Sequence, residues 1–144
     1  MELLNKEKHQ HFKYELYSEF ARIGQALSQP KRLELLDLLA QRESSVEELA
    51  NALNLSVAST SQHLQILKAA KLVATKRSGT YIFYRLSGND VYQLVQSLRQ
   101  LAENHLSEVE QLFENYIGKR EFREEVTGEE LLKRVKAGKV TLID

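Results

Sequence analysis

The chain has 144 residues, no cysteine, and equal numbers of basic and acidic side chains, 20 of each. This length suits one domain with an appendage, and 6 glycines and 1 proline suit a helical globule. The lack of cysteine excludes disulfides, thiolate metal ligands and redox-sensing thiols from this sequence. No stretch approaches the roughly 20 apolar residues of a membrane-spanning helix, and the start does not resemble a signal peptide. We therefore expect a soluble, cytoplasmic protein that does not associate with membranes.

Two helices are predicted in the first forty residues. Apolar residues at helical spacing indicate a first helix that stops at Ser28-Gln29-Pro30: Phe12, Leu16, Phe20, Ile23 and Leu27. Pro30 suits the first position of a second helix, which has too many leucines for a surface helix: Leu33, Leu35, Leu36, Leu38 and Leu39. The second helix is expected to lie at the centre of the core.

A helix-turn-helix is predicted from residue 45 to residue 70. Ser45-Val46-Glu47-Glu48 has the spacing of a capping box and opens a short helix that ends at the turn Asn54-Leu55-Ser56. A second short helix follows from about Val57 to Ala70. Two short helices joined by a tight turn, the second with a polar outer face, are typical of proteins that place a helix in the DNA major groove.

The outer face of this second helix supplies candidate base-reading residues. At about 100° per residue, Leu64 and Leu67 set the core face, and Gln62 and Gln65 point nearly opposite. Ser59 and Ser61 lie on the flanks and His63 near the core edge. Because glutamine can form two hydrogen bonds with adenine, Gln62 is the strongest candidate for reading a base.

A basic β-hairpin is predicted after Leu72-Val73, folding back at Ser78-Gly79. Its tip, residues 76–80, carries Lys76 and Arg77, which suit phosphate or minor-groove contacts. Between Glu48 and Asp90 the chain has five Lys or Arg and no acidic residue, as expected of a surface that meets a polyanion. The alternative is a solvated hairpin whose charges only keep an exposed edge soluble.

A long helix is predicted from Asn89 or Asp90 to about Gly118, with an apolar seam in steps of four and three. Its apolar surface exceeds what a small winged domain can cover, so this helix and the first one are expected to pair across a twofold axis in a homodimer. The alternative is that both helices pack on their own core.

Three segments resemble the ArsR/SmtB family of winged helix-turn-helix repressors: residues 26–36, residues 61–73 with Ser61-Gln62-His63-Leu64 and the following Leu72-Val73, and the hairpin that ends Tyr84-Arg85-Leu86. The resemblance covers roughly residues 10–118. It implies a mainly α fold with a small β-hairpin and a homodimer that leaves operator DNA when a signal arrives. It assigns contact with double-stranded DNA to Ser59, Ser61, Gln62 and His63 on the helix, and to Lys76, Arg77 and Tyr81 on the hairpin.

The expected metal ligands of that family are missing from the sequence. Where its arsenic and cadmium sensors have Cys-Val-Cys, this chain has Ser45-Val46-Glu47. Asp90 and His105 do not match the spacing of the zinc sensors, and His9 and His11 lie in a terminus expected to be frayed and solvated. We therefore expect no metal, no cofactor and no catalytic residue.

The tail is expected to form a second region, residues 119–144, after a DNA-binding and dimerisation domain at 1–118. Residues 125–144 resemble the opening of a rhodanese domain, which would make this chain truncated and would place the sulfur-carrying cysteine beyond Asp144. The signal that releases the protein from DNA would then be a sulfur or redox signal relayed by that domain. The alternative for the tail is an acidic, partly disordered segment.

Three functions follow from these features. The first is an operator-binding repressor, the second a helical module that binds another protein, and the third a sulfurtransferase if a complete rhodanese domain is present.

Overall fold

The structure is a computed structural model, and it describes the backbone of residues 1–124 and the side chains of residues 1–118. The chain divides into two compact units, Met1–Val95 and Gln96–Asp144, which are considered separately below. The predicted rhodanese-like segment, 125–144, lies outside the described residues. No helix in the described part is both long enough and apolar enough to cross a bilayer.

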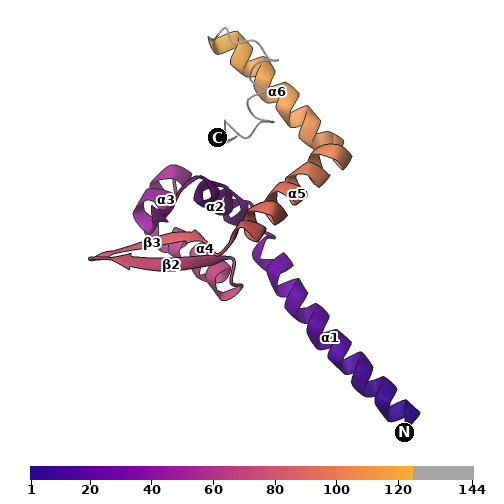
Figure 1. The fold of residues 1–144 in the computed structure, drawn as a ribbon. Coiled ribbons are helices and arrows are strands. Elements are labelled where there is room, and N and C mark those ends of the chain that lie inside the picture. Colours follow the sequence, from indigo (N-terminus) through magenta and orange to yellow (C-terminus); the bar gives the residue numbers. More distant parts are fainter. Residues whose placement is uncertain (125–144) are drawn as a thin grey trace. The chain divides into compact units, whose positions relative to one another are not determined.

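The described elements follow the order expected for a winged helix-turn-helix domain (Figure 1). The helices are α1 (Glu2–Ala26), α2 (Pro30–Gln41), α3 (Val46–Leu53), α4 (Val57–Ala69), α5 (Asn89–His105) and α6 (Ser107–Glu124). The strands are β1 (Ser44–Ser45), β2 (Val73–Ser78) and β3 (Tyr81–Leu86). The strands form one antiparallel sheet in the order β1-β3-β2. The predicted mainly helical fold with a small hairpin is confirmed.

The core of the first unit is built around α2, as the leucine pattern predicts. Its Leu35 and Leu36 are almost fully buried, together with Leu49 of α3 and Leu64 and Leu67 of α4. Ile23, Ala26 and Leu27 add the end of α1 to the same cluster. Burying a leucine side chain contributes roughly 1.5–3 kcal/mol, so these side chains fix the helix-turn-helix on α2.

The helix boundaries rest on local residues that the sequence makes visible. Pro30 occupies the first turn of α2 after an extended Gln29. Ser45 and Glu48 form both hydrogen bonds of a capping box at the start of α3. Asn54 ends α3 in the left-handed region, with φ 54°, and the Ser56 side chain caps α4.

Two details of the sheet differ from the sequence-based expectation. Strand β1 was not predicted; it pairs Ser44 with Tyr84 and Ser45 with Phe83, and a strand of two residues is too short to show an alternating pattern. The hairpin turns at Gly79-Thr80, one residue later than predicted, because Ser78 still pairs with Tyr81. Gly79 supplies the positive φ, 63°, that the first position of such a two-residue turn requires.

The prediction of one long helix from 89 to 118 is wrong, since α5 ends at His105 and α6 starts at Ser107. Asn104 and His105 are weak helix formers, and Glu108 and Glu110 place acidic side chains in the first turn of a new helix, where they are favoured. The longest described helix is instead α1, with 25 residues. The start of the predicted seam also packs on its own core, because Val91 and Val95 are buried.

Helix α1 begins earlier than a frayed terminus would allow. His9 and His11 lie inside α1, where both are exposed, and His11 pairs with Glu15 one turn later. Residues 2–22 are all exposed, so α1 joins the core of the first unit only through its last turns.

Candidate nucleic-acid interface

The helix α4 is held by contacts on its inner face. Thr60, Leu64 and Leu67 are each about 0% exposed. Thr60 is the polar member of these three buried residues. Its hydroxyl donates to the Ser56 carbonyl at 2.8 Å, so it needs no partner from another helix. One face of α4 is therefore fixed on α2 and α3, and the opposite face is available for contact.

The available face carries the side chains that the sequence predicts as base-reading residues. Gln62 is exposed, whereas Ser59, Ser61 and His63 are half-buried at the flanks. Gln65 is exposed as expected, but its amide donates to the Tyr84 hydroxyl of β3 at 3.3 Å. That bond ties α4 to the hairpin and leaves Gln62 as the better placed of the two glutamines for reading a base.

His63 is connected to a buried arginine that sequence reasoning missed. Arg32 of α2 is 7% exposed and donates to the carbonyls of Ala26, at 2.6 Å, and Gln25, at 3.1 Å. Its third contact joins Nη1 to His63 Nδ1 at 3.3 Å. Arg32 lies in the segment that resembles the repressor family, but neither its type nor its spacing indicates that it reaches α4.

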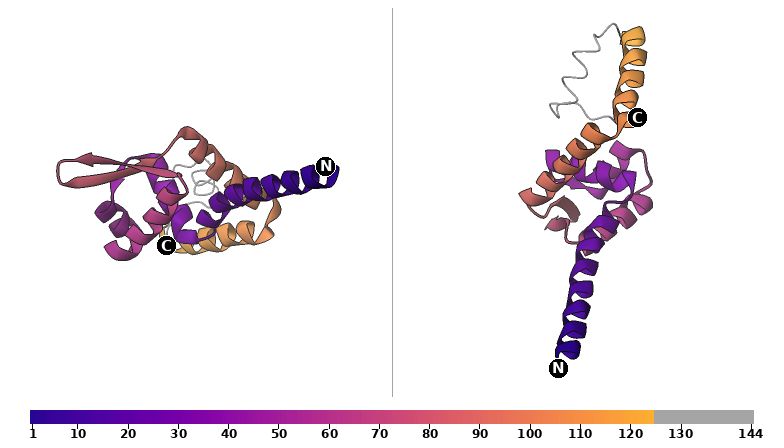
Figure 2. Two further views of the ribbon diagram at one scale, coloured as in Figure 1. Left: turned by 90° about the horizontal axis from the view of Figure 1, so that it is seen from below. Right: turned by 90° about the vertical axis from the view of Figure 1, so that its right-hand side faces the viewer.

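The hairpin presents its cations on two different faces. Lys76 pairs with Phe83 and Arg77 with Ile82, and neighbouring residues of a strand point to opposite sides. Tyr81 shares the face of Lys76 and is 61% exposed. In Figures 1 and 2 the β2–β3 ribbon extends beyond helices α3 and α4. Its tip is thus surrounded by solvent and carries one cation on each side.

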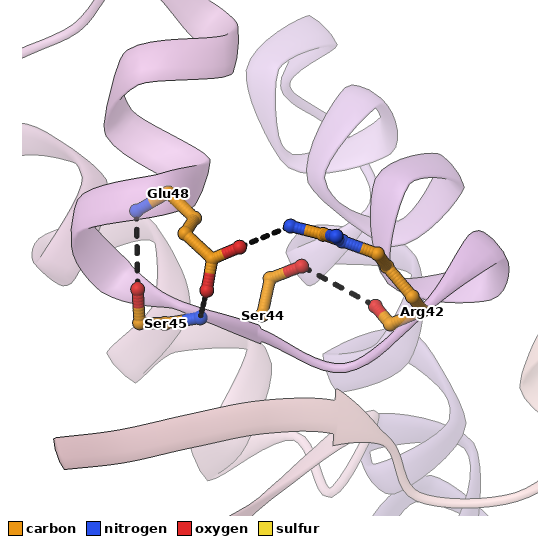
Figure 3. Close-up of polar contacts among 4 residues, drawn as sticks. All are labelled: Arg42, Ser44, Ser45 and Glu48. Atoms are coloured by element: carbon orange, nitrogen blue, oxygen red, sulfur yellow. Dashed lines mark hydrogen bonds and ion pairs between the residues drawn. The ribbon is translucent and has the colours of Figure 1, made fainter.

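Acidic side chains stay outside the segment that carries these residues, since no Asp or Glu lies between Glu48 and Asp90. Glu48 itself is occupied: its carboxylate accepts the Ser45 backbone N–H at 3.2 Å and pairs with the Arg42 guanidinium (Figure 3). The five cations of the segment are therefore not neutralised by acids of the same segment, and their field favours a polyanion.

The stretch Ser45-Val46-Glu47, which stands where the arsenic and cadmium sensors have Cys-Val-Cys, has a structural role in this chain. Ser45 accepts the Glu48 backbone N–H at 3.2 Å, and Ser44 Oγ donates to the Arg42 carbonyl at 3.4 Å (Figure 3). Among the residues whose side chains are described, no group of three or more His, Asp or Glu side chains could hold a metal ion.

A helix-turn-helix with an exposed polar second helix and a basic two-stranded wing defines the winged helix-turn-helix class of DNA-binding domains. The profile described as "Bacterial regulatory protein, arsR family" matches residues 29–75. The nodulation protein NolR of Rhizobium meliloti is 36% identical over 86 residues, which cover 60% of this chain and 70% of that protein. The chain belongs to the ArsR family of bacterial regulatory proteins.

Two mycobacterial proteins extend this comparison. The HTH-type transcriptional regulator Rv0324 of Mycobacterium tuberculosis is 40% identical over 129 residues, which cover 90% of this chain and 56% of that protein. The solution structure of the homodimeric winged helix-turn-helix DNA-binding domain Mb0332, from Mycobacterium bovis, is 41% identical with a TM-score of 0.63, and covers 65% of this chain and 87% of that one. The chain thus spans little more than half of the Rv0324 protein.

Proposed function

We propose that this protein binds an operator in duplex DNA as a homodimer and represses transcription from it. The observation that carries the proposal is the exposed outer face of α4, with Gln62 at its centre, in a segment free of acidic residues. A helix of this size fits the major groove, and the surrounding cations supply the attraction for phosphate that operator binding requires.

Each interface residue has a role in this proposal. Gln62 reads a base edge, and Ser59, Ser61 and His63 contact bases or phosphates beside it. Lys76, Arg77 and Tyr81 grip the flanking backbone or the minor groove. Because Lys76 and Arg77 lie on opposite faces of the ribbon, a wing inserted edge-on would place one cation against each wall of a groove.

The homodimer is proposed from the exposed surface of α1. Its residues 2–22 are exposed, and they include large apolar side chains such as Phe12, Tyr17 and Phe20, each more than half exposed. A contiguous apolar surface of this kind marks an interaction site. The homodimeric state of the Mycobacterium bovis domain supports the same arrangement here, in which two α4 helices read half-sites one DNA turn apart.

The central test measures operator affinity on DNA taken from upstream of the protein's own coding region. Gln62→Ala should relax the preference at one base pair in each half-site, at a cost of roughly 1–3 kcal/mol per half-site on the preferred sequence. Gln93→Ala, which removes an exposed glutamine of α5, is the matched control and should leave affinity and preference unchanged. Equal base preference in wild type and Gln62→Ala would contradict the assignment of Gln62.

The wing is tested by salt dependence. Lys76→Gln and Arg77→Gln should each weaken binding to all sequences alike. Because the homodimer carries each residue twice, each substitution should reduce the slope of log affinity against log salt by about two. Lys8→Gln, at the far end of α1, is the charge-matched control. Affinity that does not fall with salt in the wild type would refute the proposal as a whole.

We propose further that residues 119–144 are a linker and the beginning of a rhodanese-like domain, and that the releasing signal is a sulfur species. The match of 129 residues to the longer mycobacterial regulator must extend past residue 118, which supports a shared region there. Operator affinity of protein that carries the complete second domain should fall when a persulfide donor is added. Indifference to such donors would count against this signal.

A further inference from the structure

We infer that Arg32 selects the tautomer of the neutral His63 imidazole, so that His63 meets DNA as a hydrogen-bond donor through Nε2–H. The inference rests on the proposed function for its DNA partner, and on the geometry of the unbound protein for everything else. Arg32 acts as a positioning residue in this scheme, because it reaches DNA only through the imidazole of His63.

The Arg32 guanidinium is held in one orientation. It is buried, with 7% of the residue exposed, and its donors meet the carbonyl oxygens of Ala26 and Gln25 and the His63 ring. Burial of a cation is costly unless its donors are matched by acceptors, so the three contacts favour one arrangement of the side chain. Arg32 is therefore a rigid donor aimed at α4.

A rigid donor determines which ring nitrogen of His63 carries the proton. Arginine has five N–H donors and no acceptor. The contact of 3.3 Å between Arg32 Nη1 and His63 Nδ1 can be a hydrogen bond only when Nδ1 has a free lone pair. The neutral imidazole then carries its proton on Nε2, and a proton on Nδ1 would face the guanidinium directly.

This tautomer limits what His63 can recognise. A ring with Nε2–H donates to an acceptor, which on DNA is a phosphate oxygen or the N7 of a purine. It cannot accept from the amino groups of adenine or cytosine. His63 lies on the half-buried flank of α4, beside the exposed Gln62, so its donor extends the reading face by one fixed contact.

The same arginine connects this contact to α1. Gln25 and Ala26 form the last turn of α1, and their carbonyls belong to the set that a helix leaves without intrahelical partners. A second contact joins α1 directly to α4: the Arg22 side chain of α1 donates a hydrogen bond to the Ala69 carbonyl at the end of α4, at 2.9 Å. The orientation of His63 thus depends on the position of the last turn of α1. This is the same helix whose apolar surface is proposed to form the dimer.

Nitrogen-15 NMR of the unbound chain tests the tautomer of His63 directly. We expect the neutral imidazole of His63 to show an unprotonated Nδ1 and a protonated Nε2, whereas the exposed His9 should show an averaged mixture of the two tautomers. A protonated Nδ1, or an averaged spectrum for His63, would overturn the inference without affecting the proposed operator binding.

A double-mutant cycle tests the consequence for DNA. Arg32→Lys keeps the charge but cannot span all three acceptors, and it should weaken operator binding roughly tenfold. In His63→Gln the side-chain amide can donate without help from Arg32, so adding Arg32→Lys to that variant should cost less than about twofold. Equal losses in the two backgrounds would show that Arg32 acts only on the fold, and thermal unfolding of each variant measures that part separately.

Modified operators identify the acceptor on DNA. Replacing purines by 7-deazapurines removes N7, and replacing single phosphates by methylphosphonates removes the charged oxygen. One of the two series should weaken wild type about tenfold at one position and leave His63→Ala unaffected there. If neither series separates the two proteins, His63 does not donate to DNA and the inference fails; if wild type does not bind the unmodified operator at all, the proposed function fails instead.

Discussion

Helices α4 and α1 both expose much of their surface, but they do so in opposite ways. The inner face of α4 is completely buried through Thr60, Leu64 and Leu67, and its outer face is polar. Residues 2–22 of α1 are exposed on every side, and they include large apolar side chains such as Phe12 and Phe20. Contacts within one chain therefore fix the orientation of α4, whereas these apolar side chains of α1 have no covering surface within the described part of the chain.

This contrast separates two sources of DNA affinity. The geometry of α4 is a property of the folded unit Met1–Val95, because the buried contacts of α4 all lie within it. The number of α4 helices that reach one operator is a property of the dimer that α1 is proposed to form. Substitutions that act on one source and not on the other test the distinction.

The largest effect is expected from Leu67→Ala, which truncates a fully buried side chain of α4. The lost burial and the cavity left behind should reduce the free energy of unfolding by about 3–5 kcal/mol. Urea denaturation measures this loss. Ile66→Ala, at the neighbouring position, is the matched control. Ile66 is 44% exposed, so this variant should lose less than about 1 kcal/mol of unfolding free energy.

The second effect is the loss of dimer in Leu16→Glu. A carboxylate placed in the apolar stripe of α1 should weaken dimerisation by roughly 100-fold or more, because its burial against an apolar partner is unfavourable. Light scattering measures the oligomeric state, and operator affinity should fall with it. Ser18→Glu adds the same charge about 200° around the helix and should leave the dimer intact. A Leu16→Glu protein that remains dimeric would remove α1 from the proposed interface.

A smaller effect is expected from Tyr84→Phe, which removes the hydroxyl that accepts the Gln65 amide and keeps the buried ring. The loss of this link between α4 and the wing should cost about 1 kcal/mol of stability. The wing should also become less restricted, which hydrogen exchange at the β3 amides can detect. Stability equal to wild type would indicate that this hydrogen bond does not couple α4 to the wing.

The smallest effect is expected from Arg22→Gln, which breaks the tie between α1 and the Ala69 carbonyl. The Arg22 side chain is 52% exposed, so solvent screens its contacts and the loss should stay below about 1 kcal/mol. Faster amide exchange in the last turn of α4, with an unchanged dimer, is the expected signature. A loss above 2 kcal/mol would mean that α1 contributes more to the position of α4 than this contact explains.

Much of the first unit could be predicted because its signals are local. Pro30 marks the start of α2, the Ser45 capping box marks the start of α3, and Leu64 and Leu67 identify the core face of α4. In each case one residue type, or one spacing, has a single physical explanation. The exposed position of Gln62 follows from the same helical geometry.

The features that were missed depend on contacts between distant segments. Strand β1 exists because Ser44 and Ser45 meet β3, about forty residues later, and two residues carry no pattern of their own. Arg32 reaches His63 across 31 positions of sequence, and a lone arginine in a leucine-rich helix is equally compatible with an exposed side chain. The break at Leu106 was missed because the apolar seam continues in phase across it, whereas the local signals at Asn104 and Glu108 favour the break.

The hairpin buries Val73, Tyr84 and, in part, Leu86 at its base, while residues 76–82 at its tip are all exposed. The base of the hairpin consequently contributes to stability, and its tip carries the charges that attract nucleic acid. Side chains at the tip can be exchanged, one charge at a time, with stability changes within about 0.5 kcal/mol. Substitutions at the tip can therefore change the affinity of such a regulator for its target with little change in the stability of its fold.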